Sequence, residues 1–294
     1  MELATFFNYL QYEKRYSPHT LAAYRNDLQQ FCSFLSSTYQ IREAREIAAQ
    51  HIRSWIVYMV EHQVGARSIN RKISALQSFF RFLKRSGKLQ ANPMRGITAP
   101  KAPKRLPDFI PSSHLQHLFN SIEHGNDFPG LRNRLILELL YATGMRRAEL
   151  IALSDDAIDW NRNYVRVLGK GNKQRLIPIG VSLQESIKKY LEVRNQHFGR
   201  SSFARLVVSD RGKEMNPRSV YEIVRRLLKQ MSHVSRCSPH VLRHTFATHL
   251  LSNGAELQAI KELLGHASLA ATQVYTHNTV EQLKAIYRKA HPKA

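Results

Sequence analysis

The stretch that decides the fold is SPHVLRHTFATHLLSNGAELQAIKELLGHASLAATQVYTH, residues 238–277. Its opening Ser-Pro pair predicts the start of a helix, and its two glycines predict the ends of that helix and of the next. His240 and Arg243, three residues apart, then share one face near a helix N-terminus, where anions bind readily. His266 follows the second glycine, and Tyr275 comes nine residues later. The stretch predicts a helical anion-binding site with a tyrosine close behind it.

The charge of the chain predicts a polyanionic partner. Its 294 residues include 44 Lys and Arg against 22 Asp and Glu, a formal net charge of +22. The excess is spread along the chain, since 17 basic and 7 acidic residues precede position 109, and 27 and 15 follow. Each phosphate that such a protein neutralises releases condensed counterions, so nucleic acid is the favoured partner. A soluble protein with surplus basic residues and a binder of anionic membranes are the alternatives.

The sequence also indicates the compartment. No run of about 18 apolar residues could cross a membrane, and the first residues lack the cationic start and cleavage site of a signal peptide. Cys32 and Cys237 are far apart in sequence, and without a secretory signal we expect both to be reduced thiols. We therefore expect a cytoplasmic protein, long enough for two domains.

Residues 1–87 predict a helical domain that binds DNA. Apolar residues recur at helical spacing over 2–12, 18–35, 51–62 and 66–87. The opposite face of the last segment carries six cations and no acid: Arg67, Arg71, Lys72, Arg81, Lys84 and Arg85. We expect these side chains to contact DNA phosphates, with a solvated basic face as the alternative.

A linker and a second domain follow. Residues 88–108 carry four prolines and five basic residues, which predicts an extended linker that runs along DNA. Residues 109–294 predict a mainly helical domain in which 164–168 and 175–179 form the strands of a hairpin. The SLQE motif at 182–185 predicts a capping box. The expected fold class is mainly α, with a small antiparallel β-sheet in the C-terminal domain.

Candidate catalytic residues follow from what cutting a phosphodiester without a metal requires. Such a reaction needs a nucleophile, cations at the non-bridging oxygens and an acid for the leaving oxygen. Tyr275 is a candidate nucleophile, and Arg146, just after a helix-ending glycine, is a candidate cation beside Arg243. Lys170 lies between two glycines at the hairpin tip. Taken singly, Tyr275 could be a packing residue, His240 a polar residue of a helix end and Lys170 a solvated turn lysine.

A metal site is the other possibility for this region. His244 lies four residues after His240, and His249 lies five residues after His244. No nearby carboxylate or cysteine set completes a site, so we expect no metal. Cys237 lacks a resolving partner, so we expect no redox role either.

Four segments, in this order, resemble the motifs of one protein family. They are TGMRRAEL (143–150), LGKGNKQRLIPI (168–179), SPHVLRHTFATHLL (238–251) and LLGHASLAATQVYTH (263–277). With YSPHTLAAYRNDL (16–28) and SINRKISALQSFFRFL (68–83), they resemble the tyrosine recombinase (phage integrase) family, and within it the Xer-type site-specific recombinases. The resemblance covers nearly the whole chain, and the C-terminal motifs are the more specific part.

The resemblance implies that two arginines clamp the scissile phosphate. Arg146 and Arg243 match these arginines. One departure is Arg147, where the family more often has an apolar residue. It leaves open which of the two neighbouring guanidiniums enters the site, and by alignment we choose Arg146.

The resemblance implies roles for four further residues. Lys170 matches the lysine that protonates the 5′ leaving oxygen, and His240 the histidine that accepts the tyrosine proton. His266 matches a histidine that hydrogen-bonds the phosphate. Tyr275 matches the nucleophile, which forms a 3′-phosphotyrosyl bond and frees a 5′-hydroxyl. Because that bond conserves the energy of the phosphodiester, religation needs no ATP, metal or other cofactor.

The resemblance also implies an architecture and partners. We expect a two-domain, C-shaped DNA clamp that acts on a double-stranded recombination site. It would work as a homo- or hetero-tetramer with a related recombinase on two DNA sites, with a DNA translocase as a further candidate partner. We expect the helix near 279–290 to dock on a neighbouring protomer, with packing on its own domain as the alternative.

The expected task is the resolution of chromosome or plasmid dimers at cell division, that is, chromosome partition in the cell cycle. Three rival functions share parts of this sequence pattern. An integrase of a mobile element would use the same chemistry, and so would a type IB topoisomerase that relaxes one duplex. An architectural DNA-binding protein would not require Tyr275.

Overall fold

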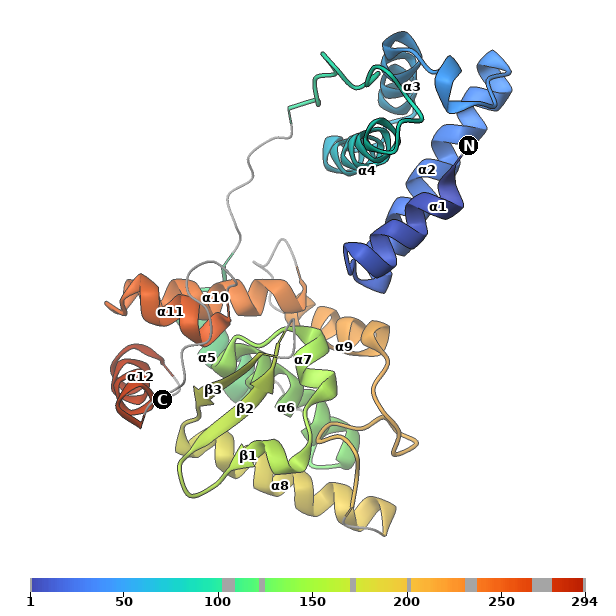
Figure 1. Cartoon of the computed structure of the whole chain (residues 1–294). Helices are drawn as coiled ribbons and strands as arrows, with labels where there is room; N and C mark the ends of the chain where they lie inside the picture. The colour runs from blue at the N-terminus through green and yellow to red at the C-terminus, as the bar shows by residue number, and fades with distance from the viewer. Residues whose placement is uncertain are drawn as a thin grey trace. The chain divides into compact units, whose positions relative to one another are not determined.

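The computed structural model describes residues 2–101, 109–121, 125–169, 173–199, 202–230, 237–265 and 277–292 (Figure 1). The chain divides into two compact units, Met1–Arg105 and Leu106–Ala294. Within the described residues the first unit is helical, and the second combines helices with a three-stranded antiparallel sheet of order β1-β2-β3. The expected fold class, mainly α with a small antiparallel sheet in the C-terminal domain, is confirmed.

The first unit is a helical bundle around one apolar core. Its helices are α1 (Leu3–Asn8), α2 (Pro18–Tyr39), α3 (Ala49–Glu61) and α4 (Ala66–Arg85), with a π-helical turn at Tyr9–Glu13 and a 3-10 turn at Ala44–Glu46. Ser17 caps α2, since its hydroxyl accepts the Thr20 N–H at 3.3 Å. α4 packs against both α2 and α3 through buried residues such as Ile73 and Phe80. Burial of each such side chain contributes about 1.5–3 kcal/mol, which fixes the face that α4 turns outward.

Residues 88–101 differ from the expected free linker. They form no helix or strand, but Met94 is buried and Leu89 packs against the same core. The Asn70 side chain donates a hydrogen bond to the Pro100 carbonyl at 3.1 Å. The apolar residues between the prolines explain the difference, because they bury surface that an extended linker would leave in water. The rest of the expected linker lies outside the described residues.

The second unit is organised around α6. Its elements are α5 (Ser112–Ser121), α6 (Phe128–Thr143), α7 (Arg147–Ala152), a 3-10 turn (Asp155–Ala157), β1 (Ile158–Asp159), β2 (Tyr164–Leu168), β3 (Gln174–Pro178), α8 (Val181–Phe198), α9 (Pro217–Lys229), α10 (Pro239–Ser252), α11 (Leu257–Leu264) and α12 (His277–Ala290). Helices α7, α8, α9 and α10 all pack against α6 (Figure 1). The apolar residues of α6 lie all round the helix, so it is buried along its length.

Several observed elements of the second unit differ from the predicted ones. β3 begins one residue before the expected strand, at Gln174, and pairs with β2 through contacts such as Val165 with Ile177. Neither α5 nor β1 was predicted. Gly180 is the N-cap of α8, and the predicted capping box at 182–185 is wrong, because the helix already begins one residue before that motif.

α12 packs on its own unit in this single chain. The Tyr287 hydroxyl donates to the Ala142 carbonyl at 3.1 Å, and the Asn253 amide donates to the Ala290 carbonyl at 2.7 Å. Leu283 is buried in the same core. Docking of this helix on a neighbour is therefore not what the single chain shows. The physical reason is that the apolar face of α12 already has partner surfaces in α10, α11 and β3.

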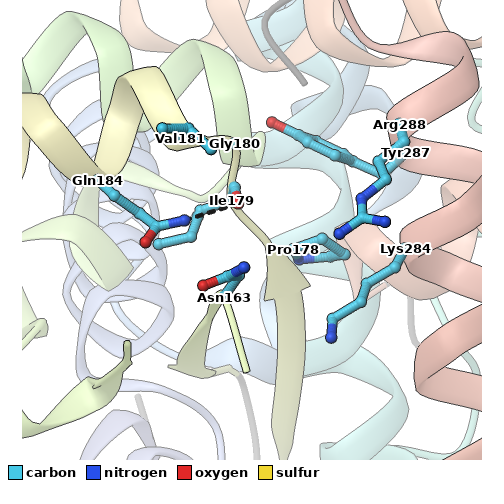
Figure 2. Close-up of a pocket in the computed structure, with 9 residues that line it drawn as sticks. All are labelled: Asn163, Pro178, Ile179, Gly180, Val181, Gln184, Lys284, Tyr287 and Arg288. Atoms are coloured by element: carbon cyan, nitrogen blue, oxygen red, sulfur yellow. Dashed lines mark hydrogen bonds between the residues drawn. The ribbon is translucent and has the colours of Figure 1, made fainter. Parts of the chain in front are cut away.

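A pocket of about 320 Å³ lies beside α12 (Figure 2). It is lined by the end of β3, the start of α8 and the α12 residues Lys284, Tyr287 and Arg288. Arg288 extends from α12 toward Pro178, and Lys284 projects from the same helix below it (Figure 2). Of the predicted catalytic residues that the structure describes, none lines this pocket. The candidate active site lies elsewhere on the unit.

Candidate active site

Arg146 is placed by the start of α7. Gly144 ends α6 in the left-handed conformation (φ 59°), with its N–H bonded to the Leu140 carbonyl at 3.1 Å. Two residues on, the Arg146 backbone N–H donates to Glu149 Oε2 at 2.7 Å and its Nη1 donates to Oε1 at 2.8 Å. Glu149 therefore closes the first turn of α7 and holds the Arg146 guanidinium. The Arg146 side chain is still 38% exposed, so a ligand can reach it.

Glu149 is a buried carboxylate shared by two arginines. It is 7% exposed, and Arg175 on β3 donates to both of its oxygens, at 3.0 and 2.7 Å. Burial alone would raise the pKa of Glu149, but the hydrogen bonds and charge of Arg175, followed by the hydrogen bonds of Arg146, hold the pKa below its ordinary value. Glu149 is therefore ionised at neutral pH and fixes both guanidiniums in one geometry.

Arg243 is placed by α10 and held at the ends of two other helices. Its Nη1 donates to the Gly144 carbonyl at 2.6 Å and its Nη2 donates to the Leu264 carbonyl at 2.7 Å. Burial lowers the pKa of Arg243 to about 10, and the positive charges of Arg146 and Arg175 contribute to the same shift. Arg243 remains a cation at neutral pH, since even this pKa lies well above 7.

The structure thus brings Arg146 and Arg243 into one site of net positive charge. Arg146 and Arg175 both donate hydrogen bonds to the Glu149 carboxylate, and Arg243 lies close enough to feel the charges of all three groups. Mutual repulsion of cations held by a rigid scaffold favours an arriving anion, because the anion relieves it. The arrangement is suited to binding a phosphate between the two predicted clamp residues.

The other predicted catalytic residues are less fully described. His240 lies in the first turn of α10. Its side chain is exposed, so a ligand can reach it. Lys170, His266 and Tyr275 lie outside the described residues. Their roles remain predictions.

The predicted DNA-binding face lies on α4. The exposed cations there are Arg67, Arg71, Arg81, Lys84 and Arg85. Two of them have intramolecular partners: Arg85 stacks on the Tyr9 ring at 4.6 Å, and Arg71 pairs with Asp27 while staying 43% exposed. Exposure leaves all five able to meet phosphates, which stays a prediction.

The structure corrects the prediction for Lys72. This residue is only 6% exposed, and its ammonium donates to Asp27 at 2.9 Å and to Gln30. The prediction that Lys72 contacts phosphate is therefore wrong. Helical periodicity explains the burial, because Lys72 lies three residues after Ile69 and four before Leu76, on the buried stripe of α4.

Sequence reasoning missed three functional features. Glu149 and Arg175 were not singled out, although the spacing of Arg146 and Glu149 by three residues at a helix start was a visible signal. The third feature is the charge on α9, a helix that buries Val220 and Val224 on one face. Its exposed face carries the cations Arg218, Arg225, Arg226 and Lys229. A basic amphipathic helix of this kind is readable from sequence.

Neither a cluster of metal ligands nor a membrane-spanning helix occurs among the described residues. Among the described residues, no three His, Cys, Asp or Glu side chains gather as possible metal ligands. His249, one of the alternative ligands, instead bonds through Nδ1 to the Tyr141 hydroxyl at 3.0 Å and is buried. Within the described ranges, no helix combines the length and apolarity needed to cross a membrane.

Comparison with solved structures identifies the fold. XerH recombinase in a post-cleavage complex with a palindromic difH substrate aligns with a TM-score of 0.71 at 19% identity, covering 92% of this chain and 76% of XerH. A lambda integrase dimer bound to a COC′ core site aligns with a TM-score of 0.69 at 18% identity, covering 93% of this chain and 99% of the integrase chain. At these identities the likeness concerns the fold alone.

Comparison of sequences identifies the family. Tyrosine recombinase XerC of Chlorobaculum parvum is 36% identical over 319 aligned positions, covering 99% of this chain and 94% of the relative. Tyrosine recombinase XerD of Halalkalibacterium halodurans is 37% identical, covering 99% of this chain and 98% of the relative. The profile of the phage integrase N-terminal SAM-like domain matches residues 3–87, and that of the phage integrase family matches residues 108–282. The chain therefore belongs to the phage integrase family of tyrosine recombinases.

Proposed function

We propose that this protein is a site-specific DNA recombinase that cuts and rejoins strands through Tyr275. The observation that carries the proposal is the pair Arg146 and Arg243, fixed by Glu149 and by two helix-end carbonyls in one cationic site. A phosphodiester entering this site would have its non-bridging oxygens neutralised by preorganised charges. No metal or nucleotide is needed for that step.

Each of the four remaining catalytic residues has its own part in the proposed reaction. The Tyr275 oxygen attacks phosphorus and its proton passes to His240. The bond from phosphorus to the 5′ oxygen breaks, and Lys170 protonates that oxygen, leaving a 3′-phosphotyrosyl link and a 5′-hydroxyl. His266 hydrogen-bonds the phosphate. Attack by the 5′-hydroxyl of a partner strand reverses these steps and joins the new strand.

DNA binding is proposed to involve basic surfaces of both units. In the first unit the five exposed cations of α4 face outward, whereas Lys72 is buried, and in the second unit the outer face of α9 is basic. Binding of phosphates by separate units would give a steep salt dependence. We propose that DNA contacts the basic surface of each unit.

The cellular task that we propose is resolution of chromosome or plasmid dimers in the cytoplasm at cell division. Support comes from relatives named XerC and XerD that match over nearly the whole chain. Integration of a mobile element, the alternative, uses the same chemistry but is not favoured by these relatives. Paired-site assays in which the two sites lie on one plasmid or on two distinguish resolution from integration.

The working assembly that we propose is a tetramer on two DNA sites, of this chain alone or with a related recombinase. A solved lambda integrase structure is described as a tetramer bound to a Holliday junction. We further propose that α12 leaves its own unit and docks on a neighbour during synapsis. A DNA translocase is a further candidate partner.

A nicked suicide substrate carrying a candidate recombination site tests the nucleophile. Loss of the short downstream fragment prevents religation, so the covalent protein–DNA adduct accumulates. The wild-type protein should become attached to DNA, whereas Tyr275→Phe should bind the same DNA without attachment. Equal adduct from both proteins would show that Tyr275 is not the nucleophile. Plasmid relaxation without paired-site product would instead indicate a topoisomerase.

A further inference from the structure

Arg175 ties three elements of the second unit together through one buried guanidinium. It lies on β3 and is 4% exposed. Its Nη1 and Nη2 donate to Glu149 of α7, and its Nε donates to the Leu263 carbonyl of α11 at 2.8 Å. A planar guanidinium can serve a carboxylate and a carbonyl at the same time, whereas a lysine ammonium lacks this fixed fork.

Each hydrogen-bond partner of Arg175 is linked to one clamp arginine, either directly or through the next residue in the chain. Glu149 itself holds the Arg146 side chain at 2.8 Å. Leu263 directly precedes Leu264, whose carbonyl accepts the bond from Arg243 at 2.7 Å. The positions of Arg146 and Arg243 therefore depend on two groups that a single side chain connects.

Two glycines pack closely against the same side chain. A Cβ placed on Gly265, which has φ +64°, would lie 3.1 Å from Arg175 Cδ. One placed on Gly169 would lie 3.5 Å from Arg175 Nη1. These glycines directly precede His266 and Lys170 in the sequence. The Arg175 side chain thus lies against the residues that directly precede Lys170 and His266 in the sequence.

We propose that Arg175 is a positioning residue for strand cleavage: it sets the separation of Arg146 and Arg243 and fixes the base of the β2–β3 hairpin. The inference rests on the proposed recombinase function. Arg175 touches no DNA in this role and acts through Glu149 and the end of α11. Its loss should lower the rate of the chemical step more than it lowers affinity for DNA.

The matched control is Arg194, a second buried arginine of the same unit. It is 0% exposed, donates to both oxygens of Asp155 at 2.9 and 2.7 Å, and also donates to the Leu206 carbonyl at 2.9 Å. Neither of these partners holds a clamp arginine. Arg175→Lys and Arg194→Lys therefore make the same chemical change in similar surroundings, but only the first should alter the clamp.

The experiment measures single-turnover adduct formation on the nicked suicide substrate, at saturating and subsaturating DNA, beside the melting temperature of each full-length variant. We expect Arg175→Lys to slow adduct formation at saturating DNA about 100-fold, the scale at which an ångström of misplacement acts. Arg194→Lys should lower the melting temperature but keep the wild-type rate. A wild-type rate for Arg175→Lys, or equal slowing by Arg194→Lys, would overturn the proposal. Absence of adduct from the wild-type protein would refute the proposed function itself.

Glu149→Gln provides a second variant if Arg175→Lys does not fold. It breaks the same connection from the other side and should also slow adduct formation at saturating DNA. Where both single variants fold, the double variant should be no slower than the slower single one, because each breaks the same link. A double variant whose loss equals the product of the two single losses would show that Arg175 does not act through Glu149.

Discussion

Arg146 and Arg147 are adjacent in sequence but differ in how their side chains are held. Arg146 precedes α7 and is tied to Glu149 through both its backbone and its guanidinium. Arg147 is the first residue of α7 and is half-exposed. Rigid positioning is what a transition-state contact requires, so we keep Arg146 as the proposed clamp residue.

Alanine variants distinguish these neighbours. Arg146→Ala should slow adduct formation on the suicide substrate by about 10²–10³-fold, the usual cost of one preorganised donor. Arg147→Ala serves as the control and should leave the rate close to that of the wild type. The reverse order of effects would assign the clamp to Arg147.

Gly144 is a second position where one residue controls the site. Its φ is 59°, its carbonyl holds Arg243, and an added Cβ would lie 2.5 Å from a Phe246 ring carbon. Gly199 offers a matched control, because its φ is 60° and nothing lies within 4 Å of an added Cβ. The two glycines share the backbone requirement and differ in the space around them.

Gly144→Ala and Gly199→Ala should therefore differ in stability. Both variants should be destabilised by about 1–2 kcal/mol, because each places a non-glycine residue in the left-handed conformation. Gly144→Ala should be destabilised by about 1–3 kcal/mol more from overpacking. Urea unfolding measures the two free energies. Equal destabilisation would mean that the surroundings of Gly144 adapt without cost.

At the scale of elements, a buried histidine joins α10 to α6. His249 bonds to the Tyr141 hydroxyl, and burial lowers the pKa of His249 below its ordinary value. The unfolded chain therefore binds this proton more tightly than the folded chain. The stability that comes from keeping His249 neutral is therefore fully present above the ordinary histidine pKa of about 6.5. It is lost as pH falls below that value.

His249→Gln should remove part of this pH dependence. Between about pH 7 and about pH 5, the unfolding free energy of the wild type should fall more steeply than that of the variant, because only the wild type must keep a buried imidazole neutral. The two slopes should coincide above that range. Identical slopes throughout would mean that His249 is not the group that titrates.

The faces of α4 allow a separate prediction about DNA binding. Arg67 and Arg81 are exposed, whereas Lys72 is buried against Asp27. Replacing Arg67 or Arg81 with Gln should reduce the slope of log affinity against log salt by about 0.9 for each phosphate that the variant no longer neutralises. Stability should stay close to that of the wild type.

Lys72→Gln is the matched control on the same helix. It should leave the salt slope unchanged and lower stability, because Asp27 is 1% exposed and would keep only one of its two cations. Filter binding over a salt series and chemical unfolding measure the two effects. A reduced salt slope for Lys72→Gln would restore it to the DNA-binding face.

At the scale of the whole molecule, α12 determines how the proposed assembly can be tested. Deletion of residues 279–294 would remove Leu283 and Tyr287 from the core, so it would disturb folding as well as assembly. Cysteines at positions 253 and 290, where a hydrogen bond of 2.7 Å joins Asn253 to Ala290, avoid this problem. Cys32 and Cys237 are replaced by serine beforehand.

Oxidation of this double-cysteine protein reports where α12 docks. The free protein should form a link within one chain, as the structure places the two positions. On DNA carrying paired sites, links between chains should appear if α12 moves to a neighbour. Links that stay within one chain under synaptic conditions would contradict docking in trans.

The sequence by itself determined most of the helices, the second unit's hairpin and the order of the catalytic motifs, because periodicity, caps and glycines are local signals. It did not determine that Lys72 meets Asp27, that residues 88–101 pack on the core of the first unit, or that Glu149 joins Arg146 to Arg175. Those features depend on which distant segments meet. Arg175 and Glu149 are 26 residues apart, and no local pattern shows that a strand and a helix will share one buried carboxylate.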